Sequence, residues 1–368
     1  MTAATTGPVR VVGTGLLGAS VGLALRGHGV DVVLSDPSRT ALALARDVGA
    51  GRPAGAGDTP TLVVVAAPPD VAAQVVAAEL AAHPNAVVTD LASVKGHVLD
   101  ELRAAGADLT RYVGSHPMAG RERSGPSAAV PDLFLGRPWV IADSGSTRPE
   151  AVLAVRSLAV DLGAVPVAMD ASAHDEAVAL VSHVPQVVAS LAAARLQDAD
   201  DAALGLAGQG LRDVTRIAAS DPALWTSILA ANAGAVHAVL VAVRSDLDAV
   251  IDALAGADAA TGPEDVAPGL LATIAQTVAR GNAGVARIPG KHGGAQREYA
   301  QVTVLVPDTP GELARLLTDV GEAGVNLEDL HLEHAAGRPV GMAQIAVLPG
   351  SAEHLEAELT ARGWRLVS

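Results

Sequence analysis

The chain has 368 residues, enough for two or three domains of about 150 residues each. Half of it is hydrophobic but only 2% is aromatic, and 40 acidic against 25 basic side chains give a formal net charge of −15. This charge argues against a nucleic-acid or anionic-membrane partner, since both require basic surface. The absence of cysteine excludes disulfides, cysteine-ligated zinc and thiol catalysis. We expect no signal peptide, find no apolar run of the ~20 residues that a span requires, and expect a cytoplasmic protein.

Short β-branched runs alternate with Ala- and Leu-rich stretches over residues 1–170. The predicted strands are Arg10–Val12, Asp31–Ser35, Leu62–Ala66, Ala86–Asp90, Tyr112–Ser115 and Trp139–Ala142. The predicted helices are Gly18–Gly27, Ser38–Val48, Val71–Ala82 and Lys95–Ala105. This alternation is typical of βαβ units and predicts an α/β domain with a parallel, doubly wound sheet.

Residues 171–280 lack strand-like runs, and apolar residues recur there at helical spacing. The predicted helices are Asp175–Gln197, Asp201–Ala219, Pro222–Ala253 and Val266–Arg280. Asp221 before Pro222 is a typical helix start. We therefore predict an all-helical second domain that forms a homodimer interface, because an apolar helical layer needs a partner surface.

Residues 281–300 are rich in glycine and predict a linker, and residues 301–368 form a compact pattern after it. Its predicted elements are strand Gln301–Val306, helix Glu312–Ala323, strands near Asn326–Glu333 and Pro339–Val347, helix Ala352–Arg362 and a short final strand. The order βαββαβ is the ferredoxin-like arrangement.

The first strand runs into a glycine-rich turn, in the sequence VRVVGTGLLGAS. The predicted cofactor contacts are Gly13, Thr14, Gly15, Leu16, Leu17, Gly18 and Asp36. The first glycine permits a tight turn, the second lets a pyrophosphate approach and the third allows close helix packing. Asp36 ends the second strand, where a carboxylate holds a ribose hydroxyl and favours NAD over NADP, although the nearby Arg39 leaves NADP open. The alternative is an ordinary βα turn in which Asp36 caps the next helix.

Three later stretches carry unusual polar residues: VTDLASVK (88–95), GSHPMAGRERSG (114–125) and GLRDVTRIAASDPALW (210–225). The first two follow strands, and open α/β sheets bind ligands at strand ends. Taken singly, each stretch has an ordinary explanation. Ser93 caps a helix, His116 belongs to a turn before Pro117, and Arg216 lies on a solvated helix face.

Taken together, these stretches resemble the prephenate dehydrogenase family, including its arogenate-using relatives. The matching segments are GTGLLGAS, Ser35-Asp36, TDLASVK, GSHPMAG with Glu122 and Ser124-Gly125, His174-Asp175, Ser182-His183-x-Pro185 and RDVTRIAASDPxxW. HPMAG followed by x-E-x-S-G is the most specific of them. The chain departs from the family pattern at Ala92, where Gly is frequent, and at Gln186, where His is common.

The resemblance implies NAD-dependent oxidative decarboxylation of prephenate to 4-hydroxyphenylpyruvate in tyrosine biosynthesis. A hydroxyl that becomes a carbonyl needs a proton acceptor that is neutral near pH 7, which is the range of histidine. His116 is therefore the expected base, and Ser93 is expected to orient it and to contact substrate and nicotinamide.

The resemblance also implies a substrate pocket. Arg216 matches the arginine that grips a substrate carboxylate, for which a planar guanidinium is suited. His183 matches a family position near the pyruvyl side chain of the substrate. Glu122 matches a residue that gates the site, and Trp225 is expected to form a wall of the pocket.

Two further acidic residues, Asp213 and Asp175, are expected to have supporting or structural roles. On a continuous helix Asp213 shares a face with Arg216 and could steady its guanidinium. His174 and His183 lie on opposite faces of a regular helix, so we expect His174-Asp175 to be structural.

The C-terminal region resembles an ACT domain through Pro307-Asp308-x-Pro310-Gly311 and Gly324-Val325-Asn326-Leu327. The resemblance implies regulation by tyrosine bound near Gly311 and Asn326, and the alternative is a structural or dimerising module. His331 and His334 point to opposite faces of a strand, so we predict no metal site.

Other functions remain open. Arogenate is the alternative substrate, although a cationic His183 near the side chain would favour the keto acid. A β-hydroxyacid dehydrogenase would rely on a lysine in the helical domain, and none occurs between Lys95 and Lys291. A non-catalytic NAD and amino-acid sensor would not need His116, Ser93 or Arg216.

Overall fold

The computed structural model describes residues 3–121, 123–258, 269–290, 298–334 and 340–367. The chain divides into two compact units. Unit 1 comprises Met1–Gln197 and Val214–Arg244, and unit 2 comprises Asp198–Asp213 and Ser245–Ser368. The helical segment predicted over 171–280 is therefore shared between the two units.

Unit 1 contains an eight-stranded sheet in the order β3-β2-β1-β4-β5-β6-β7-β8. The strands are β1 Val9–Val12, β2 Val32–Ser35, β3 Arg52–Pro53, β4 Leu62–Val65, β5 Val87–Asp90, β6 Tyr112–Pro117, β7 Pro138–Ala142 and β8 Val165–Ala168. Strands β1 to β6 are parallel, but β7 runs antiparallel to β6 and pairs in parallel with β8. The prediction of an all-parallel sheet is thus wrong at one edge, and β3 and β8 were not predicted.

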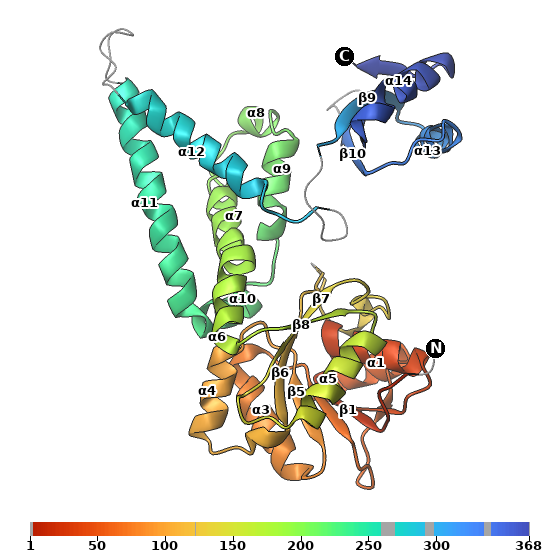
Figure 1. Cartoon of the computed structure of the whole chain (residues 1–368), viewed down its shortest axis with the longest axis vertical. Helices are drawn as coiled ribbons and strands as arrows, with labels where there is room; N and C mark the ends of the chain where they lie inside the picture. The colour runs from red at the N-terminus through yellow and green to blue at the C-terminus, as the bar shows by residue number, and fades with distance from the viewer. Residues whose placement is uncertain (1–2, 122, 259–268, 291–297, 335–339, 368) are drawn as a thin grey trace. The chain divides into compact units, whose positions relative to one another are not determined.

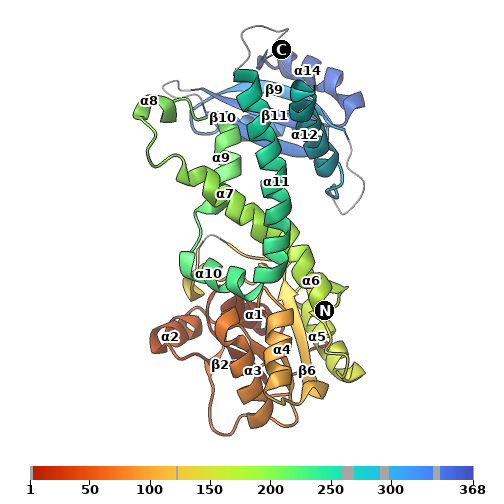
Figure 2. The ribbon, with the colours of Figure 1, turned by 90° about the vertical axis from the view of Figure 1, so that its left-hand side faces the viewer.

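Helices cover both faces of this sheet (Figure 1 and Figure 2). One face packs against α1 Leu16–Gly27, α2 Arg39–Asp47 and α5 Pro149–Asp161, and the other against α3 Pro69–Ala82 and α4 Gly96–Ala104. Strand β4 shows why both faces are filled. Val64 contributes to one core, Val63 and Val65 contribute to the other, and all three are fully buried. The doubly wound arrangement is confirmed, although helix α5 was not predicted.

The helical part of unit 1 follows β8 along the chain. It consists of α6 Ala171–Val178, a π-helical turn Ala179–His183, α7 Val184–Ala194, a 3-10 turn Arg216–Ala218, α10 Pro222–Ala231 and the first half of α11 Ala233–Asp258. Asp221 Oδ1 accepts from the Ala223 amide at 2.8 Å, which confirms the predicted helix start. The continuous helical run Ala171–Ala194 is long and apolar enough to span a membrane. It contains His174, Asp175 and His183, however, and all three are buried within the folded unit. Such side chains are rare in membrane spans and fit a core helix of a folded domain.

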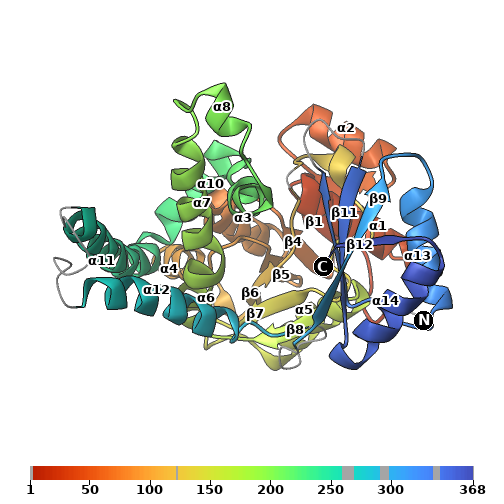
Figure 3. The same cartoon turned by 90° about the horizontal axis from the view of Figure 1, so that it is seen from above.

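Unit 2 ends in a four-stranded antiparallel sheet of order β10-β11-β9-β12. Its elements are β9 Ala300–Pro307, α13 Glu312–Glu322, β10 Asp329–His334, β11 Val340–Val347, α14 Ala352–Ala361 and β12 Arg365–Val367. Both helices cover one sheet face (Figure 3), where Val304, Leu316 and Leu355 are fully buried. The predicted βαββαβ order is confirmed.

In the described part of unit 2, the other elements are helices. It contains α8 Asp201–Leu204, most of α9 Gln209–Thr215, the end of α11 and α12 Leu270–Val285. Because α12 continues to Val285, the first residues of the predicted linker are helical. Residues 291–297 of that linker lie outside the described residues.

Candidate active site

The glycine-rich turn between β1 and α1 has the shape that a dinucleotide requires. Gly13 has a φ of 92°, and a Cβ there would lie 2.4 Å from the Ala66 carbonyl oxygen. A Cβ on Gly18 would lie 1.9 Å from the Gly13 carbonyl oxygen. Gly15, in contrast, faces open space at the start of α1. The first and third glycines therefore serve packing, and the second leaves room beside the helix amides, which fits a bound pyrophosphate.

Asp36 joins the end of β2 to this turn. Its Oδ2 accepts from the Thr14 amide at 2.6 Å and the Thr14 hydroxyl at 2.9 Å, and its Oδ1 accepts from the Ser38 amide at 2.7 Å. Leu16 and Leu17 form the half-buried first turn of α1. The carboxylate is thus fixed beside the glycine turn, where it fits a ribose hydroxyl and would repel a 2′-phosphate.

His116 is a buried residue of β6, where its Cα is paired with that of Val140. Its Nδ1 lies 2.8 Å from Nε2 of His174, and the two rings meet edge to face at 5.1 Å. Nδ1 of His174 in turn lies 2.7 Å from Oδ1 of Asp175. The structure therefore places His174-Asp175, which we had expected to be structural, directly behind the predicted base.

Asp175 also holds the turn that carries Ser93. Its Oδ1 accepts from the Lys95 amide and its Oδ2 from the Gly96 amide, both at 2.8 Å, at the start of α4. Ser93 is half-buried in that turn. Among the hydrogen bonds of the described residues, the partner of His116 Nδ1 is His174 and not Ser93.

Burial and neighbouring charges set the protonation of these groups. Burial, reinforced by His174, Lys95 and His183, holds the pKa of His116 well below its usual range. Burial alone would raise the pKa of Asp175, but hydrogen bonds from His174, Lys95 and Gly96 keep it below the ordinary value. At neutral pH the site therefore contains an uncharged His116 and an ionised Asp175.

A buried ion pair lies next to His116. The Lys95 ammonium pairs with Asp90 Oδ1 and donates to the Ser115 carbonyl at 2.8 Å, and the Tyr112 hydroxyl donates to Asp90 Oδ2 at 2.7 Å. Burial lowers the pKa of Lys95, opposed by Asp90, and raises the pKa of Tyr112 well above its usual range. This cluster was not predicted from the sequence, although TDLASVK contains an acid at the end of an apolar strand and a lysine shortly after it.

His183 closes the π-helical turn between α6 and α7, and this turn breaks the regular helix on which our separation of His174 from His183 depended. Nδ2 of Asn232, at the bend between α10 and α11, lies 3.1 Å from His183 Nδ1 and donates to the Asp175 carbonyl at 2.8 Å. The Trp225 ring lies 6.0 Å from the His183 ring, nearly perpendicular to it. The structure thus brings His183 and Trp225 together beside the pair behind His116.

Burial lowers the pKa of His183 to about 4, with a further contribution from His174. The ring is therefore neutral at pH 7, and the expectation that it could be cationic is wrong. Because the Asn232 amide group donates to Nδ1, the ring proton is on Nε2, which makes that atom a hydrogen-bond donor.

Arg216 begins the 3-10 turn that follows α9 and is exposed. Helix α9 ends at Thr215, so the continuous helix that we expected to align Asp213 with Arg216 does not exist. Asp213 instead accepts from Gln209 at 2.8 Å. Glu122, the predicted gate, lies outside the described residues.

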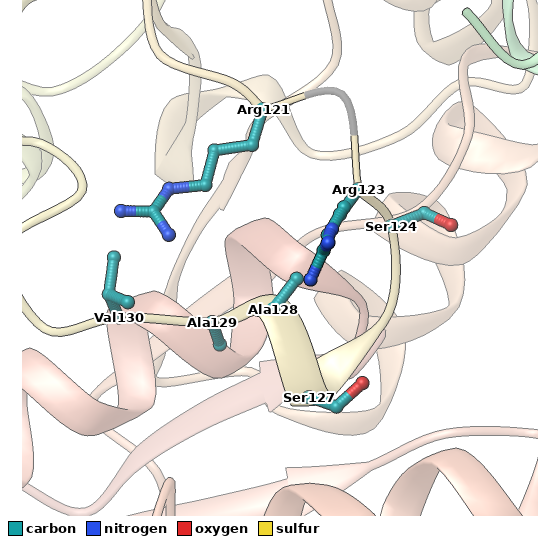
Figure 4. A pocket seen from close by; sticks show the side chains of 7 residues that line it. All are labelled: Arg121, Arg123, Ser124, Ser127, Ala128, Ala129 and Val130. Atoms are coloured by element: carbon teal, nitrogen blue, oxygen red, sulfur yellow. The ribbon is translucent and has the colours of Figure 1, made fainter. Parts of the chain in front are cut away.

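Residues of the connection from β6 to β7 line an open pocket of about 680 Å³. Figure 4 shows Arg121 and Arg123 extending from one side of it toward the segment that holds Ala128 and Val130. The Val130 amide donates to the Ser20 hydroxyl of α1 at 3.1 Å. Two cations therefore lie in a connection that is joined to the helix of the glycine turn.

The predicted regulatory residues lie at exposed turns of the C-terminal sheet. Gly311, with a φ of 97°, directly precedes α13, and a Cβ there would meet nothing within 4 Å. Asn326 donates to Glu328 Oε1 at 2.7 Å.

Two family models match this chain. The nucleotide-binding domain of prephenate dehydrogenase matches residues 21–168, and its dimerization domain matches residues 170–262. The probable prephenate dehydrogenase NovF of Streptomyces niveus is 40% identical over 356 residues, which is 96% of this chain and 98% of that protein. The cyclohexadienyl dehydrogenase of Zymomonas mobilis is 28% identical and covers 68% of this chain and 89% of its own length.

Solved structures agree with these matches. The crystal structure of a putative prephenate dehydrogenase from Corynebacterium glutamicum has a TM-score of 0.65 and 28% identity, and covers 76% of this chain and 90% of that one. Aquifex aeolicus prephenate dehydrogenase was solved with hydroxyphenyl propionate and NAD+. Its TM-score is 0.64 at 24% identity, and the match covers 75% of this chain and 97% of that one. At that identity the Aquifex structure supports the fold alone.

Proposed function

The chain belongs to the prephenate dehydrogenase family, and from this premise we propose that it converts prephenate to 4-hydroxyphenylpyruvate with NAD, in tyrosine biosynthesis. The observation that carries this proposal is the buried, uncharged His116 at the carboxyl end of β6, where an open α/β sheet binds its ligands. The pairing of a glycine turn with Asp36 supports NAD as the cofactor.

NAD supplies the hydride acceptor for the ring carbon that carries the hydroxyl group. The protein contributes the groups that hold it. The three glycines Gly13, Gly15 and Gly18 allow the pyrophosphate to lie against the amides of α1, and Asp36 accepts from the ribose. Thr14, Leu16 and Leu17 complete the wall of the turn.

His116 moves one proton in each direction. Its Nε2 accepts the hydroxyl proton as the ring carbon becomes a carbonyl. Loss of CO2 then leaves its bonding electrons in the ring, which becomes aromatic with a phenolate oxygen. His116 returns the proton to that oxygen, so the base is restored at the end of the reaction. Ser93, from the neighbouring turn, contacts the same end of the substrate.

The other end of the substrate carries a keto group and a carboxylate. Arg216 binds a carboxylate as a bidentate partner, Trp225 forms a wall, and Glu122 gates the site. His183 presents Nε2–H and donates to the keto oxygen. The amino group of arogenate is itself a donor and cannot accept from Nε2–H, so this tautomer favours prephenate.

A homodimer and a regulatory module complete the proposal. Leu180, Val181 and Leu191 are 62, 65 and 61% exposed on the α6–α7 run, within the match to a dimerization domain. We assign 1–170 to cofactor binding, 171–280 to substrate binding and dimerisation in the cytoplasm, 281–300 to a linker and 301–368 to an ACT domain. This last domain binds tyrosine near Gly311 and Asn326, with a purely structural role as the alternative.

The test compares substrates and cofactors directly. Purified protein is assayed for NADH or NADPH formation with prephenate or arogenate, each with NAD or NADP, and with or without tyrosine. We expect the highest kcat/KM with prephenate and NAD. A preference for arogenate would make arogenate the substrate in place of prephenate. NAD binding without turnover of either compound would support the alternative of a non-catalytic NAD and amino-acid sensor.

A further inference from the structure

We propose that His174 and Asp175 are positioning residues that fix the ring proton of His116 on Nδ1 and leave its Nε2 as the basic atom of the site. This inference rests on the proposed function in taking His116 as the base. It adds two residues to the reaction, and it follows from the chain of contacts Asp175–His174–His116.

The direction of each hydrogen bond can be derived from the carboxylate. An ionised carboxylate only accepts hydrogen bonds, so Nδ1 of His174 must carry a proton and donate it to Asp175. In the proposed arrangement the His174 ring carries this one proton only, which leaves its Nε2 as an acceptor. That atom lies 2.8 Å from His116 Nδ1, so Nδ1 of His116 is the donor. The neutral His116 ring then has its only free lone pair on Nε2.

Burial and several hydrogen bonds hold His174 and Asp175 in one orientation. His174 is fully buried, and both carboxylate oxygens of Asp175 accept amides at the start of α4. Asn232 donates to the backbone carbonyl of Asp175. A Cβ on Gly96 would lie 2.8 Å from Asp175 Oδ2, so glycine is required for this approach. The tautomer of His116 is thus fixed by the fold before substrate binds.

The same contacts stabilise the protonated base. The titratable groups that face His116 are Lys95, His174 and His183, and of these the Lys95 ammonium opposes a positive charge on the His116 ring. When Nε2 accepts the substrate proton, the ring becomes a cation whose Nδ1–H already donates to His174. The ionised Asp175 lies behind His174 and provides the negative charge of this network. Without His174 the cation would be buried beside an ammonium group with no acceptor.

The kinetic test replaces His174 in the full-length enzyme, with prephenate and NAD. His174→Phe keeps a ring of similar size but removes the acceptor. We expect kcat to fall ~100-fold or more, as for general bases, with KM for prephenate changed less than ~threefold. His174→Gln keeps an acceptor oxygen and should recover about tenfold. Glu176→Gln, on an exposed position of the same helix, is the control and should retain wild-type kcat.

The spectroscopic test does not depend on turnover. Protein labelled with 15N-histidine and loaded with NAD is examined by long-range proton–nitrogen NMR, with His116→Asn used to assign the ring. We expect His116 to show a protonated Nδ1 and an unprotonated Nε2. In His174→Phe the Nδ1 proton should lose its hydrogen-bonded shift, and in Asp175→Asn the ring should show a mixture of tautomers.

Each outcome decides the proposal. A His116 ring protonated on Nε2 in the wild type overturns it, even if prephenate proves not to be the substrate. It is also overturned if folded His174→Phe keeps kcat within twofold of wild type, or if the affinities for prephenate and NAD fall by as large a factor as kcat does. If the tautomer is as proposed and no substrate turns over, only the proposed function fails.

Discussion

The buried pair of Lys95 and Asp90 gives a prediction that can be worked out from its contacts. Both side chains are fully buried, and the carboxylate also accepts from the Tyr112 hydroxyl at 2.7 Å and the Ala92 amide at 2.9 Å. Lys95→Met has a similar volume but leaves the carboxylate with two neutral donors. Removing one partner of a buried pair costs about 3–5 kcal/mol, because the remaining charge is uncompensated.

This loss should be visible as a lower melting temperature. For a unit of about 150–250 residues, each kcal/mol lowers Tm by about 2–4 °C, so we expect a fall of roughly 6–20 °C. Thermal and urea unfolding followed by tryptophan fluorescence measure it. The double variant Lys95→Met/Asp90→Asn removes both charges and should recover part of the loss.

An exposed ion pair provides the matched control. Arg46 and Asp47 pair at 2.6 Å with side chains that are 54 and 58% exposed. Arg46→Met should change stability by less than about 1 kcal/mol. The reasoning is refuted if Lys95→Met is no more destabilising than Arg46→Met, or if the double variant is less stable than the single one.

Three further substitutions and one pH profile test other contacts. Gly96→Ala places a Cβ 2.8 Å from Asp175 Oδ2 and should lower kcat about tenfold with a cost of about 1–3 kcal/mol in stability; an unchanged kcat would contradict this. Asn232→Leu removes the donor to His183 Nδ1 and should raise KM for prephenate about tenfold, which steady-state assays check. Asp36→Asn should raise KM for NAD and narrow the preference for NAD over NADP, and a preserved ratio of the two kcat/KM values would count against its role. Because burial lowers the pKa of His183 to about 4, its protonation should not reduce kcat/KM for prephenate between about pH 8 and about pH 6; a fall in kcat/KM that follows the titration of a histidine near pH 6.5 would show that the ring is not held neutral.

The parts that sequence predicted well are those in which local pattern and structure coincide. The glycine-rich turn was predicted correctly because the backbone comes so close to Gly13 and Gly18 that no larger residue fits at either position. The four C-terminal strands alternate apolar and polar residues, and their order was correct. His183 and Trp225 were assigned to one pocket through the resemblance, and the structure places their rings 6.0 Å apart.

The parts that were missed depend on contacts between distant segments. The bond between His116 and His174 joins residues 58 positions apart, and no periodicity in either segment indicates it. The π-helical turn at Ala179–His183 breaks the regular helix, so the regular spacing gave the wrong angle between His174 and His183. The antiparallel β7 was missed because β-branched runs do not show the direction of a strand.

The central claim is that His116 is the base of an NAD-dependent reaction on prephenate. The most direct measurement compares NADH formation by wild-type protein and by His116→Asn at saturating prephenate and NAD, with the affinity for NAD determined separately by titration. We predict that the wild type forms NADH and that the variant loses about 10²–10⁴ in kcat, the usual contribution of a general base, while its affinity for NAD changes less than about twofold. A variant whose kcat stays within about threefold of wild type would contradict the account.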